Sequence, residues 1–149
     1  MSFNFPQSSA LYGIPEREAA SLRLHPQFKY GDDPYRLFNS DEFRHKSGDN
    51  KALYGSVPYI YARGNTTHSA ILWLNSAETW VDIYDDSSSF VSESGQLDVV
   101  MFAASSPKQL LTKLAQITGF APLPPIYSLG FHFSKYDETS AQTIMDRDT

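Results

Sequence analysis

Short apolar stretches separated by turn-forming residues run along the chain to about residue 103, a pattern typical of β-strands. Residues 57–62 (VPYIYA) predict one strand, with Pro58 at its start or on a sheet edge because proline cannot donate to a ladder. Residues 70–74 (AILWL) are apolar at consecutive positions, so we expect both faces of that strand to be covered. This part of the chain is therefore predicted to be mainly β.

Two more strands are predicted further along the same region. Residues 79–83 (TWVDI) alternate, which places every second side chain, beginning with Thr79, on one face. The short polar connection before Thr79 favours a hairpin with residues 70–74, and residues 97–102 (LDVVMF) predict the next strand. Three tracts are loops by composition: residues 46–50, 64–67 and 85–89.

Helical periodicity replaces the β pattern after residue 105. Ser106 is placed as an N-cap, and Pro107 as the first helical residue, where its missing N–H costs nothing. Four apolar residues then share one helix face: Leu110, Leu111, Leu114 and Ile117. Gly119 can serve as the C-terminal cap. We therefore predict a helix that begins at Pro107 and ends before Gly119.

The C-terminal part of the chain follows a different plan. Residues 121–125 (APLPP) predict a stiff linker, residues 126–133 (IYSLGFHF) predict one more strand, and Thr139 or Ser140 could cap a further helix. A lone strand and the start of a helix cannot bury their apolar faces by themselves. We interpret them as the first β and the start of the first α of a larger repeating unit.

Composition narrows the classes of partner and chemistry. The net charge is −5 with no block of basic residues, which argues against nucleic acid or an anionic membrane as partner. The absence of cysteine excludes disulfides, thiolate metal sites and a cysteine nucleophile. No apolar run reaches the roughly 18 residues of a membrane span, and the N-terminus lacks the features of a signal peptide. Four histidines show no metal-ligand spacing and are interpreted as structural or surface residues: His25, His45, His68 and His132.

Six blocks of sequence, found in order across nearly the whole chain, resemble glycoside hydrolase family 31. The blocks are residues 11–16 (LYGIPE), 34–41 (PYRLFNSD), 52–59 (ALYGSVPY), 73–83 (WLNSAETWVDI), 92–95 (SESG) and 124–132 (PPIYSLGFH). Any one block alone would be a weak signal, whereas six that are correctly ordered and spaced make a strong one.

The resemblance implies a fold and an activity. It implies a galactose-mutarotase-like N-terminal β-sandwich at residues 1–121, incomplete at its N-terminus, and the truncated start of a (β/α)8 catalytic barrel at residues 122–149. Family members are retaining α-glucosidases, which need two carboxyl groups about 5–5.5 Å apart. In the family these groups belong to two aspartates, a nucleophile and a general acid, on loops after later barrel strands. We therefore assign no catalytic residue to this chain, and expect the 149 residues alone to be inactive.

The resemblance also proposes substrate-binding residues. A sandwich loop of the family carries an Asn-x-Asp segment that helps bind sugar hydroxyls, and Asn39 and Asp41 match it. A carboxylate can accept a pair of hydroxyl hydrogen bonds from a sugar ring, although Asp41 as an ordinary turn or cap residue is the alternative. Glu138 departs from the family, since an aromatic residue that lines the sugar pocket is expected there.

Several other residues could carry chemistry. Glu78 and Asp82 could form an acid pair, but capping a turn and facing solvent is the simpler interpretation, and Glu93 is likewise read as a turn residue. Trp73 and Trp80 could stack on sugars, although core packing fits Trp73 better in its apolar run.

Cellular context comes from the sequon and from the resemblance. Asn65-Thr66-Thr67 is an N-glycosylation sequon in a predicted loop. The matching branch of the family trims α-linked glucose from N-glycans in the endoplasmic reticulum lumen with a non-catalytic β-subunit and without a metal or organic cofactor. The rival hypothesis is a stand-alone β-sandwich that binds carbohydrate or another protein without catalysis.

Overall fold

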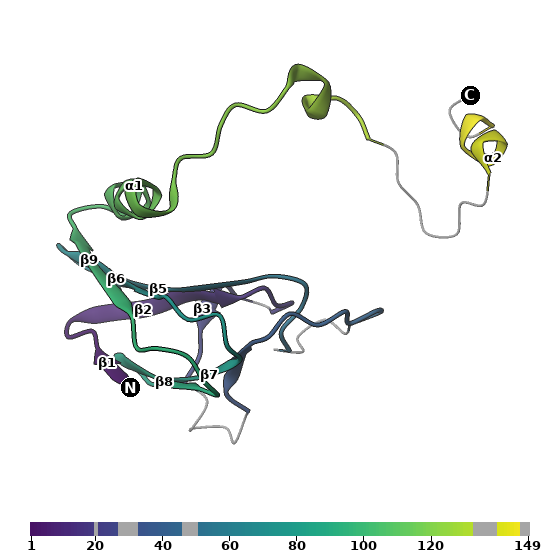
Figure 1. The fold of residues 1–149 in the computed structure, drawn as a ribbon. Helices are drawn as coiled ribbons and strands as arrows, with labels where there is room; N and C mark the ends of the chain where they lie inside the picture. Colours follow the sequence, from purple (N-terminus) through teal and green to yellow (C-terminus); the bar gives the residue numbers. More distant parts are fainter. Residues whose placement is uncertain (20, 27–32, 46–50, 133–139, 147–149) are drawn as a thin grey trace. The chain divides into compact units, whose positions relative to one another are not determined.

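The computed structural model describes residues 1–19, 21–26, 33–45, 51–132 and 140–146. The chain divides into two units, Met1–Thr118 and Gly119–Thr149. The first unit is a β-sandwich of two antiparallel sheets with one helix, as Figure 1 shows. The prediction of a mainly β chain with an N-terminal β-sandwich is confirmed by this architecture.

Sheet B has five strands, in the order β3-β2-β5-β6-β9. Their bounds are Arg23–Leu24 for β3, Ser8–Pro15 for β2, Ser56–Gly64 for β5, His68–Trp73 for β6 and Val99–Ala104 for β9. The strands predicted over residues 57–62 and 70–74 thus correspond to β5 and β6, and the strand predicted at 97–102 begins two residues later, as β9.

Sheet A has four strands, in the order β1-β8-β7-β4. Their bounds are Ser2–Asn4 for β1, Ser87–Ser92 for β8, Thr79–Ile83 for β7 and Tyr35–Leu37 for β4. The alternation predicted for β7 is confirmed, because Thr79, Val81 and Ile83 are all fully buried.

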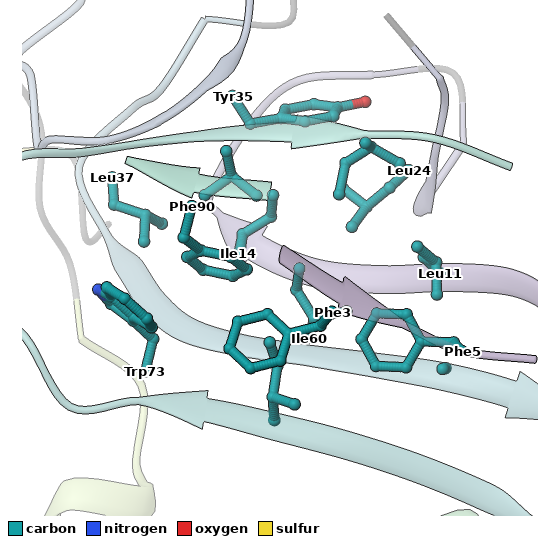
Figure 2. Close-up of a cluster of buried hydrophobic side chains, with 14 residues drawn as sticks. Phe3, Phe5, Leu11, Ile14, Leu24, Tyr35, Leu37, Ile60, Trp73 and Phe90 are labelled. Atoms are coloured by element: carbon teal, nitrogen blue, oxygen red, sulfur yellow. The ribbon is translucent and has the colours of Figure 1, made fainter. Parts of the chain in front are cut away.

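The hydrophobic core lies between the two sheets (Figure 2). Aromatic rings form its centre: Trp73 stacks on Phe90 with ring centroids 5.2 Å apart, and Phe3 meets Phe90 edge to face at 5.7 Å. Aliphatic side chains from both sheets complete it, among them Leu11, Ile14, Leu24, Leu37 and Ile60. Burial of these side chains is the main stabilising term for the sandwich.

Strand β6 is buried on both faces, as its apolar run predicts. Ile71 and Trp73 point into the core between the sheets, while Ala70 and Leu72 belong to a second cluster on the opposite face of sheet B. That second cluster includes Leu110 of helix α1, Pro107–Thr118. The helix therefore covers the outer face of the sheet over β6 and β9.

Helix α1 follows its local signals closely. The Oγ of Ser106 accepts a hydrogen bond from the amide of Gln109 at 3.3 Å, as expected of an N-cap, and Gly119 has a positive φ of 95°. Only part of the predicted apolar face is used, because Leu110 is buried and Leu114 packs against the cluster, whereas Leu111 is exposed.

Pro58 lies near the start of β5, although β5 is an internal strand and not an edge. The β2–β5 register shifts here, between the Gly13↔Ile60 and Ile14↔Val57 pairs. A bulge of this kind removes the need for a ladder donor at the proline.

Two predictions in this unit are wrong. Strands β6 and β7 do not form a hairpin: β6 pairs with β5 and β9, while β7 pairs with β4 and β8. The apolar faces of β6 and β7 instead meet across the core.

The tract 85–89 is also only partly a loop, because Ser87 begins β8, whose backbone pairs with β1 and β7 on either side. The loop predicted at 64–67 joins β5 to β6. The loop predicted at 46–50 lies outside the described residues.

The second unit contains a 3₁₀ helix, η1, at Ile126–Leu129, and helix α2 at Ala141–Met145. The prediction of a strand over 126–133 is therefore wrong for its first four residues. The amide and hydroxyl of Ser128 both donate to the carbonyl oxygen of Pro125, at 3.0 and 2.7 Å, so local bonds replace a ladder partner. Ser140 is confirmed as a cap, since its side chain accepts from the amide of Thr143.

Candidate functional site

The candidate loop, residues 38–45, follows β4 and carries the Asn-x-Asp segment. One backbone hydrogen bond ties it to the segment before β5, and two more tie that segment to the residue after β2. The amide of Ser40 donates to the carbonyl of Leu53 at 2.8 Å, the amide of Leu53 donates to the carbonyl of Glu16 at 2.9 Å, and the amide of Glu16 donates to the carbonyl of Gly55 at 2.7 Å. The end of β2 and the segment before β5 therefore position the loop.

Asn39 and Asp41 both expose their side chains on the candidate loop. The hydroxyl of Tyr54 donates a hydrogen bond to the Asp41 carboxylate, and this bond is the main reason that the pKa of Tyr54 is raised above its ordinary value. Partial desolvation and the negative charges of Asp41, Glu16 and Glu42 raise that pKa further. The Asp41 carboxylate is exposed, so it remains accessible to a ligand.

Aromatic residues accompany the two polar residues on the candidate loop and in the segment to which it is bonded. Phe38, Phe43 and Tyr54 are all large exposed side chains. The guanidinium of Arg36 lies 4.6 Å from the centre of the Phe38 ring, and that of Arg44 lies 5.1 Å from the centre of the Phe43 ring. Rings held by such cation–π contacts offer flat apolar faces beside hydrogen-bonding groups. This combination suits a sugar, which has apolar C–H faces and equatorial hydroxyls.

Further polar contacts lie within the candidate loop and between it and the segment after β2. The Oγ of Ser40 donates to Oε1 of Glu42 at 3.3 Å, and Nε2 of His45 lies 2.9 Å from Oε2 of Glu18. Arg44 adopts a positive φ of 60°, a conformation that few residues other than glycine take. Across the ranges that the structure describes, no group of three or more His, Cys, Asp or Glu side chains could hold a metal ion.

The other acidic candidates serve structural roles. Glu78 forms an ion pair with Arg36, which joins the start of β7 to β4, and its backbone carbonyl accepts from the amide of Glu93 at 3.0 Å. Asp82 lies on the outer face of β7, away from the core. Glu78 and Asp82 are therefore not brought together as an acid pair.

The two tryptophans and two of the histidines lie in different parts of the sandwich. Trp73 is buried in the core, as predicted, while Trp80 is half-buried on the outer face of β7. Nδ1 of His68 lies 2.8 Å from the hydroxyl of Tyr61, on the side of sheet B that carries α1. His25 donates its amide to the hydroxyl of Tyr35 at 3.1 Å.

Three remaining residues complete the set of predicted positions. Asn65 is exposed in the turn between β5 and β6. His132 is exposed, and its ring Nε2 lies 3.2 Å from the carbonyl of Ser128. Glu138, the position that departs from the family pattern, lies outside the described residues.

Sequence reasoning missed the aromatic part of the site. The sequence did carry a signal for exposed rings, because Phe38 and Tyr54 belong to the blocks 34–41 and 52–59. Each ring lies next to or near turn residues, and neither belongs to an alternating strand pattern. Nothing local indicated that the two blocks lie side by side. Their proximity follows from the Ser40–Leu53 hydrogen bond, which joins them across the fold.

Comparison with known proteins identifies relatives of this chain. A model of the glycosyl hydrolase 31 N-terminal galactose mutarotase-like domain matches residues 1–82. Glucosidase 2 subunit alpha of Saccharomyces cerevisiae is 37% identical over an alignment that covers 100% of this chain and 16% of the yeast protein.

Solved structures give the same result. A crystal structure of glucosidase II alpha subunit, described as DNJ-bound, superposes with a TM-score of 0.83 at 31% identity, covering 99% of this chain and 18% of that one. A structure of an ER glucosidase II heterodimeric complex, of catalytic subunit and the binding domain of the regulatory subunit, has a TM-score of 0.68 at 32% identity, covering 77% of this chain and 14% of that one. The chain thus spans less than a fifth of the length of these relatives. With a matching domain model over its first 82 residues and aligned relatives along its length, this chain belongs to glycoside hydrolase family 31.

Proposed function

We propose that this chain supplies the substrate-contacting sandwich of a retaining α-glucosidase that removes α-linked glucose from N-glycans or related α-glucosides. The observation that carries the proposal is the exposed Asp41 carboxylate, hydrogen-bonded by Tyr54 on one side and accompanied by Asn39 on the same loop. The rings of Phe38 and Phe43 add exposed apolar surface on the same loop. Such a set binds sugar hydroxyls and a sugar face together.

The sandwich contributes binding and not bond cleavage in this proposal. Retaining hydrolysis needs a nucleophile and a general acid, both carboxyl groups, about 5–5.5 Å apart across the scissile bond. On a (β/α)8 barrel such groups lie on loops at the carboxyl ends of the strands. We assign neither role to a residue of this chain. Residues 122–149 would belong to the barrel, and residues 1–121 to the sandwich.

The relatives support a proposed partner and a proposed location. The heterodimeric structure that resembles this chain pairs a catalytic subunit with part of a regulatory subunit and is described as an endoplasmic reticulum enzyme. We infer that the protein works in the lumen of that compartment with a non-catalytic β-subunit. None of the helices that the structure describes is long and apolar enough to cross a membrane.

A second candidate function is carbohydrate binding without catalysis. Asn39, Asp41 and the exposed rings favour this function too, since all of them lie on the sandwich. The two functions differ in one measurable property: a binding module holds an α-glucoside unchanged, whereas the enzyme releases glucose from it.

Steady-state kinetics on the complete polypeptide test the proposal. Asp41→Ala should raise KM for a glucosylated oligosaccharide about tenfold or more, because a hydrogen bond to a charged group contributes about 1.5–3 kcal/mol. Asp98→Asn, which alters another exposed carboxylate, should leave KM unchanged. Equal kinetics for wild type and Asp41→Ala would reject the assignment of the candidate loop. If no glucose is released by any form while binding still depends on Asp41, the binding module is the correct function.

A further inference from the structure

The turn between β5 and β6 holds the sequence Asn65-Thr66-Thr67, and its geometry points to a modification site. Gly64 and Thr67 approach so closely that a Cβ on residue 64 would lie 2.0 Å from the carbonyl oxygen of Thr67. Only glycine fits at that position. The close approach closes a tight turn, and it leaves Asn65 and Thr66 at the tip.

The side chains that define the sequon are all accessible. Asn65, Thr66 and Thr67 are each exposed. Within the ranges that the structure describes, the amide of Asn65 makes no hydrogen bond to protein. Asn75 is different: its amide donates to the carbonyl of Ser94 at 2.8 Å, and its Oδ1 accepts from the amide of Ala77 at 2.8 Å. Asn75 is therefore used to build a turn, whereas Asn65 is free for modification.

Open space lies beside Asn65. Asn65 lines a surface cavity of about 290 Å³, together with Phe5, Gln7, Thr66, Ser69 and Phe102. The lining combines aromatic rings with hydroxyl and amide groups. A sugar attached at Asn65 would have both kinds of contact group beside it.

We propose that Asn65 is the acceptor of an N-linked glycan. The inference rests on the proposed function, because the attachment of N-glycans requires the polypeptide to enter the lumen of the endoplasmic reticulum. The sequence makes the assignment unambiguous for this chain. Of its asparagines, Asn65 is the one followed by any residue but proline and then by serine or threonine.

The test is the electrophoretic mobility of the complete polypeptide, expressed in a eukaryotic host, before and after treatment with peptide-N-glycosidase F. Asn65→Gln and Thr67→Ala should each remove the mobility shift of one glycan, while the conservative Thr67→Ser should retain it. Mass spectrometry of the peptide that begins at Gly64 should show conversion of Asn65 to aspartate after enzyme treatment. An Asn65→Gln protein with unchanged mobility would overturn the proposal.

A second acceptor separates failure at Asn65 from failure to enter the lumen. Asp86→Asn creates the triplet Asn-Ser-Ser, whose acceptor lies in the exposed turn after β7 and whose two serines are the first residues of β8. If this variant gains a glycan while Asn65 carries none, the inference about Asn65 is wrong and the proposed location stands. If neither position carries a glycan, the inference and the proposed location both fail.

Discussion

The indole Nε1 of Trp73 donates a hydrogen bond to the Oγ of Ser92 at 3.1 Å, and this bond joins β6 of sheet B to β8 of sheet A. The Oγ of Ser92 also lies 2.6 Å from the Oγ1 of Thr79, which in turn donates to the carbonyl of Ala77 at 3.0 Å. Ser92 can accept from the indole and donate to Thr79. Two buried polar groups are thereby satisfied inside the core, where an unpaired donor is costly.

Ser92→Ala should destabilise the sandwich by about 1–3 kcal/mol, because it leaves the buried indole N–H of Trp73 without its acceptor. Urea unfolding followed by far-UV circular dichroism and tryptophan fluorescence measures the change. Ser94→Ala, at an exposed position two residues further on, should change the free energy of unfolding by less than about 0.5 kcal/mol. Equal effects of the two substitutions would contradict the proposed role of the Trp73–Ser92 bond.

Gly13→Ala should destabilise the chain by about 3 kcal/mol or more. Gly13 has a φ of 115°, and a Cβ there would lie 2.1 Å from the backbone carbonyl oxygen of Tyr59 in β5. Gly119→Ala is the matched control: its φ is 95°, but a Cβ would meet nothing within 4 Å. The control should cost only about 1–2 kcal/mol of backbone strain. A thermal unfolding experiment that ranks the two substitutions in the opposite order would refute this account of the β2–β5 bulge.

Tyr59→Phe should stabilise the chain by about 1 kcal/mol, because the Tyr59 hydroxyl is buried without a hydrogen-bond partner in the part of the chain that the structure describes. Burial, and to a lesser degree the neighbouring Tyr61, raises the pKa of Tyr59. The stability that this shift contributes is complete below the unfolded-state pKa of about 10 and is lost as pH rises through the higher folded-state value. Denaturation midpoints measured from pH 8 to 12 should fall less steeply for Tyr59→Phe than for wild type. A parallel decline would show that Tyr59 does not titrate in this way.

Asp41→Asn should lower the pKa of Tyr54 towards the ordinary tyrosine value. The hydrogen bond to Asp41 is the main cause of the raised pKa, and the neutral side chain also removes the largest nearby negative charge. The ring resonances of Tyr54, followed by NMR during an alkaline titration, report the change. Asp98→Asn serves as the control, and a Tyr54 pKa that is the same in both variants would show that the Asp41–Tyr54 bond does not form in solution.

The sequence determined those elements that depend on interactions between residues close together in the chain. Helix α1 begins at Pro107 after the Ser106 cap and ends before Gly119, as predicted, because each of these residues acts within one helical turn. The burial of both faces of β6 and the inward face of β7 also follow from hydrophobic pattern alone. The Asn-x-Asp segment could be named from resemblance, and the structure places it on an exposed loop.

Tertiary structure alone decided which segments became partners. The connection between β6 and β7 looked like a hairpin, yet it carries the chain from one sheet to the other, since alternation specifies a buried face and not the strand against which it packs. Residues 87–89 form a strand because β1 and β7 supply backbone hydrogen-bond partners. Residues 126–129 form a 3₁₀ helix because their backbone groups hydrogen-bond to nearby residues of the same segment. Tyr54 reached Asp41 in the same way, through the non-local Ser40–Leu53 bond. A sequence carries no signal for such pairings, because each depends on two distant segments whose backbone groups satisfy each other only after the chain has folded.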